Sequence, residues 1–258
     1  IGLFRHGAMD DFTYTLNVFN SHLEKTGLAG NLNGKTILEI GPGDSISTAI
    51  LASSFGAQTI MVDAGFYATR DIESYRNMVN DFQNKGLIFP FDINNIHTID
   101  ELLLNCKAKY LTNGLNSLLQ IESNSVDLIF SQAVLEHIRK NEFLDTMNHY
   151  YRILKKKGIC SHQIDLRDHL GGSLNNLRFS EKIWESKFFS SSGFYTNRIR
   201  FSQMIKVFEK IGYKTLVTKK YSWSKLPISR NKLNSNFANL NEEDLLINVF
   251  DVILKKSS

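Results

Sequence analysis

The residues best suited to chemistry are two carboxylates placed around a pair of glycines. Glu39 lies two residues before Gly41, and Asp63 lies twenty positions after Gly43. Glycines let the backbone turn sharply and approach a ligand closely, and an acidic residue at that later position is where a ribose diol is held. Glu39 would repel a diphosphate and attract an ammonium or sulfonium. The pattern predicts a nucleotide-binding corner for a cationic ligand.

A second candidate group is a histidine beyond a later strand. His169 follows the strand predicted over 158–164, at the carboxyl end where open α/β sheets hold their substrates. An imidazole titrates near neutrality, which suits a general base. Asp165 and Asp168 are close enough in sequence to orient His169. His137, after the preceding strand, is either a further catalytic group or a helix-start residue packed on the sheet.

Alternating strands and helices must position these groups. The sequence predicts seven strands, at 36–40, 59–62, 109–112, 126–130, 158–164, 213–223 and 245–254. Helical periodicity lies between most of them. We expect an α/β fold: a Rossmann-like three-layer sandwich with a mostly parallel seven-stranded sheet and an antiparallel closing strand.

Three segments extend this single predicted domain, 1–258. Residues 1–34 are a helical N-terminal segment with an apolar stripe from Phe12 to Leu23, which reads equally as a lid or as core cover. Arg5 and His6 precede that helix and could reach an active site. Residues 65–106 are a helical insertion, and 166–200 are an excursion on the substrate side.

One short basic run has a structural interpretation. Lys155, Lys156 and Lys157 precede Gly158 and follow a helical pattern. Cations at a helix C-terminus, followed by a glycine, are a common helix ending. We therefore expect the helix to end at this glycine.

Composition narrows the class of protein. The net charge of +4 over 258 residues is far below that of a dedicated nucleic-acid binder. Cys106 and Cys160 stand alone, without metal-ligand or disulfide spacing. No apolar run approaches the ~20 residues of a membrane span. We expect a cytoplasmic protein, although a removed targeting segment stays possible because the chain begins at Ile1.

The glycine turn also distinguishes between nucleotides. A dinucleotide corner needs a third glycine for close helix packing, and Ile46 occupies that position. Residues 30–165 resemble the class I S-adenosylmethionine-dependent methyltransferases, with Glu39-Ile40-Gly41-Pro42-Gly43 similar to their first motif in a looser form. The resemblance implies S-adenosylmethionine as cofactor and S-adenosylhomocysteine as product. It implies cofactor contacts from Glu39, Gly41, Pro42, Gly43, Asp44, Asp63, Ala64, Asn113, Gly114, Leu115, Ser131, Gln132 and Ala133.

The same resemblance separates branches of the family. Amino-group nucleic-acid methyltransferases carry an Asn/Asp-Pro-Pro-aromatic motif after strand four, and Ser131-Gln132-Ala133-Val134 differs from it. The segments 165–169, 175–180 and 195–198 are similar to methyltransferases of bacterial glycan and surface-polysaccharide genes. This implies O-methylation of a sugar, sugar nucleotide or related metabolite. The candidate substrate-binding residues are Arg178, Asn197 and Arg198. The two arginines could either hold an anionic substrate by bidentate bonds or form surface or inter-loop salt bridges. An RNA-modifying enzyme and a catalytically inactive binding protein of the same fold are the alternatives.

A metal site is a further alternative within the family. Some members bind a divalent ion through Glu-x-x-Glu-His after strand four. Here Glu136 and His137 match, but Ala133 replaces the first glutamate. His162 or His169 could complete such a site, and we expect none.

Overall fold

The computed structural model describes residues 9–257, so Arg5 and His6 lie outside the described residues. Its seven strands form one sheet in the order β3-β2-β1-β4-β5-β7-β6. β1 pairs in parallel with β2 and β4, β2 pairs in parallel with β3, and β6 pairs antiparallel with β7. The predicted fold class is confirmed. The strands are β1 (Thr36–Ile40), β2 (Gln58–Val62), β3 (Ala108–Leu111), β4 (Val126–Gln132), β5 (Leu154–Asp165), β6 (Tyr213–Ser222) and β7 (Ile247–Lys256).

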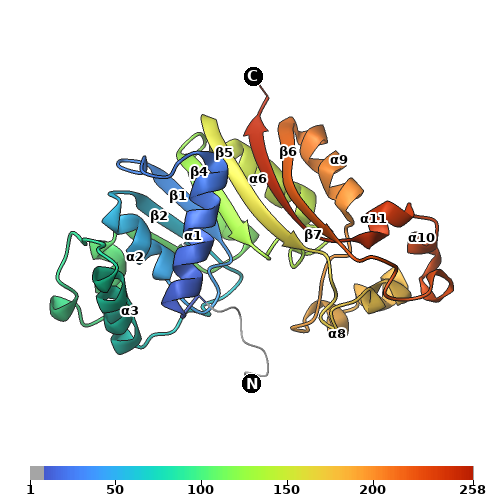
Figure 1. Ribbon diagram of the computed structural model, residues 1–258, viewed down its shortest axis with the longest axis horizontal. Helices are drawn as coiled ribbons and strands as arrows, with labels where there is room; N and C mark the ends of the chain where they lie inside the picture. Colours follow the sequence, from blue (N-terminus) through green and yellow to red (C-terminus); the bar gives the residue numbers. More distant parts are fainter. Residues whose placement is uncertain (1–8, 258) are drawn as a thin grey trace. The chain divides into compact units, whose positions relative to one another are not determined.

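Helices occupy most connections between the strands (Figure 1). The α-helices are α1 (Phe12–Thr26), α2 (Ser47–Ser54), α3 (Ile72–Asn84), α4 (Ile99–Asn105), α5 (Leu115–Leu118), α6 (Phe143–Ile153), α7 (Glu181–Trp184), α8 (Lys187–Ser190), α9 (Phe201–Ile211), α10 (Ser235–Ala238) and α11 (Glu242–Leu246). Three 3₁₀ helices are η1 (Ile93–Asn95), η2 (Asn175–Arg178) and η3 (Arg230–Lys232).

The described residues form two compact units. Unit 1 comprises residues 9–132 and 149–161, and unit 2 comprises residues 133–148 and 162–257. The glycine turn and Asp63 belong to unit 1, whereas His137, His169 and the 166–200 segment belong to unit 2.

Unit 1 is built on β1 and β2, with α1, α2 and α3 packed against one another. The predicted N-terminal helix is confirmed as α1, which begins at the N-cap Asp11 and ends at Gly27 in the left-handed conformation. The α1 side chains Phe19 and Leu23 join the core of this unit. Burial of that apolar stripe against the sheet is what stabilises the helix.

The insertion between β2 and β3 also has the predicted helices. Thr98 and Glu101 form a capping box at the start of α4. Tyr75 of α3 is buried, and its hydroxyl accepts the Ile46 N–H at 3.2 Å and donates to the Thr69 carbonyl at 3.1 Å. The insertion thus supports the loop after β1 by direct hydrogen bonds.

Unit 2 is built on the antiparallel pair β6 and β7, with α9 packed against β6. The helix α9 carries Phe201, Ile205 and Phe208, and Gly212 ends it with a φ of 107°. A separate small core joins the 3₁₀ helix η2 to the connection between β6 and β7; its buried members are Leu174, Leu177, Leu233, Phe237 and Leu245.

The interpretation of the lysine run is wrong. α6 ends at Ile153, and β5 begins at Leu154, so the three lysines lie in a strand. Lys155 Nζ pairs with Asp127 Oδ2 at 2.7 Å. Gly158 is required by packing, because a Cβ there would lie 2.7 Å from Leu154 Cδ1 and 3.0 Å from the Val126 carbonyl oxygen.

Two smaller expectations concern cysteines and membranes. Cys106 and Cys160 are both buried and form no disulfide within residues 9–257, and burial raises the pKa of the Cys106 thiol to about 12. Both therefore behave as small apolar core residues. Within residues 9–257, no helix combines the length and the apolar character needed to cross a membrane.

Candidate functional site

Strand register brings the predicted cofactor residues of unit 1 to one edge of the sheet. Ile40 of β1 is aligned with Val62 of β2 and Ser131 of β4, and Val62 is aligned with Leu111 of β3. The residues that follow these positions therefore leave the sheet at the same carboxyl edge. This is the edge where open α/β sheets bind ligands.

The glycine turn is closed by the carboxylate of Asp63. Gly41 and Gly43 both have a φ of 68°, a left-handed conformation that disfavours other residues. Asp63 Oδ2 accepts the Gly43 N–H at 3.2 Å, and Oδ1 accepts the Ala64 N–H at 2.7 Å. The Gly41 N–H donates to the Val62 carbonyl at 2.8 Å. These bonds fix the carboxylate beside the turn.

Glu39 is the buried acid of this site. Its side chain is 3% exposed, and its Oε2 atom has no hydrogen-bond partner among residues 9–257. Burial raises the pKa of Glu39 to about 8; the Thr48 hydroxyl opposes the rise and the charge of Asp63 adds to it. A buried acceptor without a partner is costly unless a ligand uses it.

The other predicted cofactor positions surround the turn. Asp44 Oδ1 accepts the Met9 N–H at 3.0 Å, which ties the start of α1 to the loop. The Gly114 N–H donates to the Asp63 carbonyl at 2.8 Å, and the Asn113 N–H donates to Ser117 Oγ at 2.9 Å. Leu115 begins α5, Pro42 and Ser131 are buried, and Gln132 ends β4.

Ala133 belongs to unit 2 and begins a turn. Its φ is 52°, and its N–H donates to the Gln163 carbonyl at 2.9 Å. Residues 131 and 132 extend β4 and a tight turn follows, with the His137 N–H bonded to the Val134 carbonyl at 2.8 Å.

Aromatic residues around Asp63 were missed by the sequence analysis. Phe66 and Tyr67 are each 40% exposed, and Arg70 lies 4.1 Å from the centre of the Phe66 ring. Tyr110 packs 5.1 Å from Phe66, centre to centre, and its hydroxyl donates to the Gly65 carbonyl. Their proximity to Asp63 in sequence was a usable signal, since exposed rings beside a nucleotide site can stack on a base.

Tyr14 of α1 is a second residue that the sequence analysis missed. Burial, followed by the charge of Asp44, raises the pKa of the Tyr14 hydroxyl, and the Gln132 side chain opposes the rise. The ring is 39% exposed. α1 therefore contributes a polar group to the edge that carries the glycine turn. No local pattern signals a contact across 118 residues of sequence.

In unit 2 the structure brings His169 and His137 together. Their rings stack with centres 5.0 Å apart and an angle of 15° between the planes. The two Nε2 atoms are 3.3 Å apart, and both side chains are exposed. His137 Nδ1 lies 2.9 Å from the Tyr195 carbonyl oxygen.

These contacts fix the protonation pattern of the neutral pair. A carbonyl oxygen only accepts, so His137 Nδ1 carries the proton, and His137 Nε2 is then an acceptor. His169 Nε2 must therefore donate across the 3.3 Å contact, which leaves the lone pair of His169 on Nδ1. The atom available to take a proton is His169 Nδ1.

The aspartates do not orient His169 as expected. Asp165 receives three bonds from the Arg167 guanidinium, including one of 2.6 Å from the terminal nitrogen to Oδ2. Asp168 is buried, and its carboxylate accepts the backbone N–H groups of Leu170, Ser173 and Asn175. Asp165 thus binds Arg167, and Asp168 binds the backbone of its own loop. The side chain that orients His169 is His137.

The three predicted substrate residues have different environments. Arg178 is exposed at the end of η2 and makes no hydrogen bond or ion pair with any residue in 9–257. Asn197 is buried and donates to the Leu135 and Ile138 carbonyls. The fully buried Arg198 side chain donates to the Phe179 carbonyl at 2.7 Å and pairs with Glu181 at 2.6 Å. These contacts make Asn197 and Arg198 structural, whereas Arg178 can reach a ligand.

The residues considered for a metal lie in β5 and in the loops that follow β4 and β5. Burial, ahead of the charge of Asp165, raises the pKa of Glu136 well above its usual range, and Glu136 Oε1 accepts the Asp165 N–H at 3.2 Å. His162 is buried in β5. No cluster of three or more potential ligands for a metal ion occurs within the part of the chain that the structure describes.

Three of the solved structures similar to this chain are named as methyltransferases. Phosphoethanolamine N-methyltransferase 2 of Haemonchus contortus, solved with S-adenosyl-L-methionine, is 16% identical with a TM-score of 0.53, covering 94% of this chain and 53% of that one. Magnesium protoporphyrin IX methyltransferase of Synechocystis, solved with S-adenosylhomocysteine, is 12% identical with a TM-score of 0.51, covering 94% and 83%. A SAM-dependent methyltransferase from Archaeoglobus fulgidus is 13% identical with a TM-score of 0.50, covering 95% and 100%.

These similarities show a shared fold. The chain spans about half the length of the Haemonchus contortus enzyme. No curated protein sequence matches the chain. The sequence profile described as a methyltransferase domain matches residues 16–216, which include both the glycine turn and the histidine pair. The chain therefore belongs to the methyltransferase-domain family.

Proposed function

We propose that the protein transfers a methyl group from S-adenosylmethionine to a hydroxyl of a small polar acceptor, with S-adenosylhomocysteine as the second product. The acceptor class that we propose is a sugar, sugar nucleotide or related metabolite of surface-glycan biosynthesis. Family membership supports the methyl transfer. The exposed histidine base and Arg178 in unit 2 support a polar, anionic acceptor.

The observation that carries the proposal is the pairing of Asp63 with the glycine turn beside the buried Glu39. Asp63 is held against Gly43 at 3.2 Å, where it can bind the ribose hydroxyls. Glu39 Oε2 offers an unused acceptor to a cation. Both features fit a nucleoside that carries an ammonium and a sulfonium better than they fit a diphosphate. Phe66 and Tyr67 offer rings to the adenine.

The chain's own residues do three things in this reaction. Bound S-adenosylmethionine supplies a methyl group already activated by the positive charge on sulfur. Asp63 and the glycine turn fix the nucleoside, and alignment of donor and acceptor is worth up to ~7–11 kcal/mol of the barrier. His169 Nδ1 takes the proton of the acceptor hydroxyl, an effect typically worth ~10²–10⁴-fold. His137 keeps His169 in the required tautomer.

Calorimetric titration of the protein with S-adenosylmethionine, S-adenosylhomocysteine and NAD tests the cofactor. We expect micromolar binding of the first two, as is typical of enzyme ligands (~1 μM–1 mM), and no NAD binding. Tight NAD binding without a response to S-adenosylmethionine would overturn the proposal. Incubation with a panel of monosaccharides, sugar nucleotides and RNA, read by mass spectrometry, tests the acceptor; methylated RNA alone would replace the sugar.

A further inference from the structure

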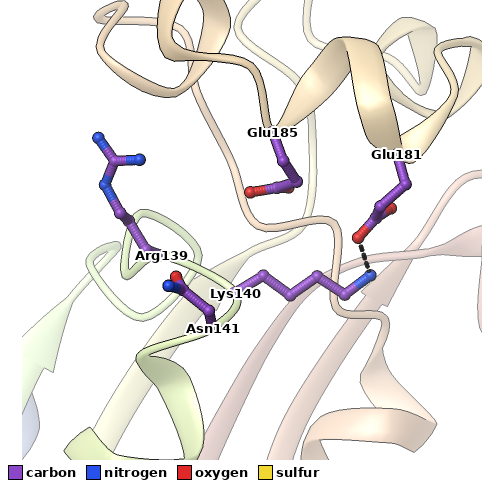
Figure 2. Close-up of a pocket in the computed structure, with 5 residues that line it drawn as sticks. All are labelled: Arg139, Lys140, Asn141, Glu181 and Glu185. Atoms are coloured by element: carbon purple, nitrogen blue, oxygen red, sulfur yellow. Dashed lines mark hydrogen bonds and ion pairs between the residues drawn. The ribbon is translucent and has the colours of Figure 1, made fainter.

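A pocket in unit 2 lies between the loop after β4 and the helix α7. It has a volume of about 370 Å³ and is lined by Arg139, Lys140, Asn141, Glu181 and Glu185. Figure 2 shows Arg139, Lys140 and Asn141 on the loop. Glu181 of α7 and Glu185, the residue that follows α7, lie on the opposite side of the pocket. Small-molecule sites typically span ~300–1,000 Å³, so the volume suits one small ligand.

One side of this pocket is already paired within the protein. Glu181 accepts from Lys140 Nζ at 2.5 Å through one oxygen and from Arg198 at 2.6 Å through the other. The charge on Glu181 is therefore balanced twice. These contacts hold the loop and α7 in a fixed relation, and they leave the other lining residues to meet a ligand.

The other side keeps unused hydrogen-bonding capacity. The Arg139 guanidinium and the Asn141 amide make no hydrogen bond or ion pair within residues 9–257. Glu185 Oε2 accepts the Tyr195 hydroxyl at 2.9 Å, whereas Glu185 Oε1 has no hydrogen-bond partner in that range. An unpaired guanidinium suits a carboxylate or phosphate. An amide and a carboxylate oxygen suit hydroxyl groups.

Tyr195 connects this pocket to the histidine pair. Its carbonyl oxygen receives His137 Nδ1 at 2.9 Å, and its hydroxyl receives the Lys140 N–H at 3.3 Å while bonding Glu185. Its ring stacks on the buried Trp184 of α7. Tyr195 therefore bonds two lining residues of the pocket and also His137, the partner of the proposed base.

We infer that this pocket binds the anionic sugar portion of the acceptor, with Arg139 on a carboxylate or phosphate and with Asn141 and Glu185 on ring hydroxyls. The inference rests on the proposed function for its link to methyl transfer. The binding itself does not need the cofactor. The charged and amide side chains that line the pocket suit a polar ligand, and Arg139 as the unpaired cation separates an acidic sugar from a neutral one.

Binding to the full chain without cofactor tests the pocket. The probes are glucuronic acid, glucose 6-phosphate, glucose and inorganic phosphate, followed by ligand-observed NMR. We expect one or both acidic sugars to bind at least 10-fold more tightly than glucose and inorganic phosphate. Arg139→Gln should weaken the acidic sugars by roughly 10- to 100-fold, because a charge-assisted pair is lost. Lys182→Gln, an equal charge loss on an exposed α7 residue outside the pocket, should change affinity less than 2-fold.

The outcomes separate the pocket from the proposed reaction. The ratio between glucuronic acid and glucose 6-phosphate shows whether a carboxylate or a phosphate is the anion. Four results would each overturn the inference. Glucose could bind as tightly as both acidic sugars, or inorganic phosphate as tightly as glucose 6-phosphate. No sugar could bind, or Arg139→Gln and Lys182→Gln could have equal effects. If the protein binds acidic sugars but does not bind S-adenosylmethionine, the inference about the pocket is supported and the proposed function is overturned.

Discussion

The two compact units hold their candidate groups by different means. In unit 1, backbone N–H groups of Gly43 and Ala64 fix the Asp63 carboxylate. In unit 2, side chains hold side chains, as His137 holds His169 and Tyr195 holds Glu185. A backbone-built site needs glycines at set spacings, which a sequence displays. A site built from side-chain networks depends on contacts between residues far apart in the chain.

The largest effect is expected from a substitution that breaks the histidine pair of unit 2. His169→Asn removes the proposed base, and we expect kcat to fall by roughly 10²–10⁴-fold. The affinity for S-adenosylmethionine should stay unchanged, since the glycine turn is untouched. Steady-state kinetics on the acceptor and calorimetry with the cofactor measure the two effects. His97→Asn, in the exposed insertion, is the matched control; equal kcat in both variants would remove His169 as the base.

A comparison of Arg198 with Arg178 distinguishes a structural arginine from a substrate-binding one. Arg198→Met removes a buried guanidinium from two carbonyls and from Glu181, and it should lower the free energy of unfolding by about 2–4 kcal/mol. Arg178→Met, on an exposed residue, should change stability by less than about 0.5 kcal/mol and raise KM for an anionic acceptor. Chemical denaturation and kinetics give both values. Unchanged stability with a raised KM in Arg198→Met would restore its predicted substrate role.

Asp63 tests the backbone-built site of unit 1. Asp63→Ala loses the acceptor of the Gly43 and Ala64 N–H groups and the proposed ribose contact, so S-adenosylmethionine should bind roughly 10- to 100-fold more weakly. Asp71→Ala, which removes only the N-cap of α3, should lower stability by about 1 kcal/mol without changing cofactor affinity. Equal cofactor affinity in both variants would contradict the proposed ribose contact.

Features with a local signal are predicted correctly from the sequence. The first strand, the glycine turn and the spacing to Asp63 are all readable within thirty residues, and register then places them at one edge. The prediction of a helix end at the lysine run is wrong because cations before a glycine are compatible with a strand as well as with a helix end. The deciding contacts, Lys155 with Asp127 and Gly158 with Val126, are tertiary. Packing overrides local preference in such cases.

The histidine pair shows the same limit at the candidate site. The position of His169 after a strand predicts it as a candidate base, but the nearby aspartates do not orient it. Arg167 and the loop backbone use those carboxylates, and His137 lies 32 residues away in sequence. Burial of Arg198 likewise depends on Glu181 and Phe179, which no periodic pattern connects to it.

A smaller effect is expected from the residue that positions the base. His137→Phe keeps a ring beside His169 and removes the Nε2 acceptor, so His169 can adopt the other tautomer. We expect kcat to fall by about 10-fold, as for other partners that orient a functional histidine, with a changed pH profile and an unchanged KM. A variant with the wild-type pH profile would show that His137 only packs against His169.

The smallest effect concerns the buried acid of unit 1 and depends on pH. The pKa of Glu39 in the folded protein, about 8, lies above the ordinary value of 4.5. The folded protein therefore binds more protons than the unfolded chain between these values, and this contribution to stability is complete below pH 4.5 and is lost as pH rises through 8. Relative to Glu39→Gln, the wild type should lose about 1 kcal/mol of unfolding free energy between pH 7 and 8.

Cofactor binding should move the same proton in the opposite sense. A cation beside Glu39 favours the carboxylate, so S-adenosylmethionine binding should release a proton near pH 7, and affinity should rise several-fold from pH 6.5 to 8 in the wild type. Glu39→Gln cannot ionise and should show neither effect. Calorimetry in buffers of different ionisation enthalpy measures the proton directly. Proton release in the Gln variant equal to that of the wild type would place the titrating group elsewhere and leave Glu39 as a neutral hydrogen-bonding residue.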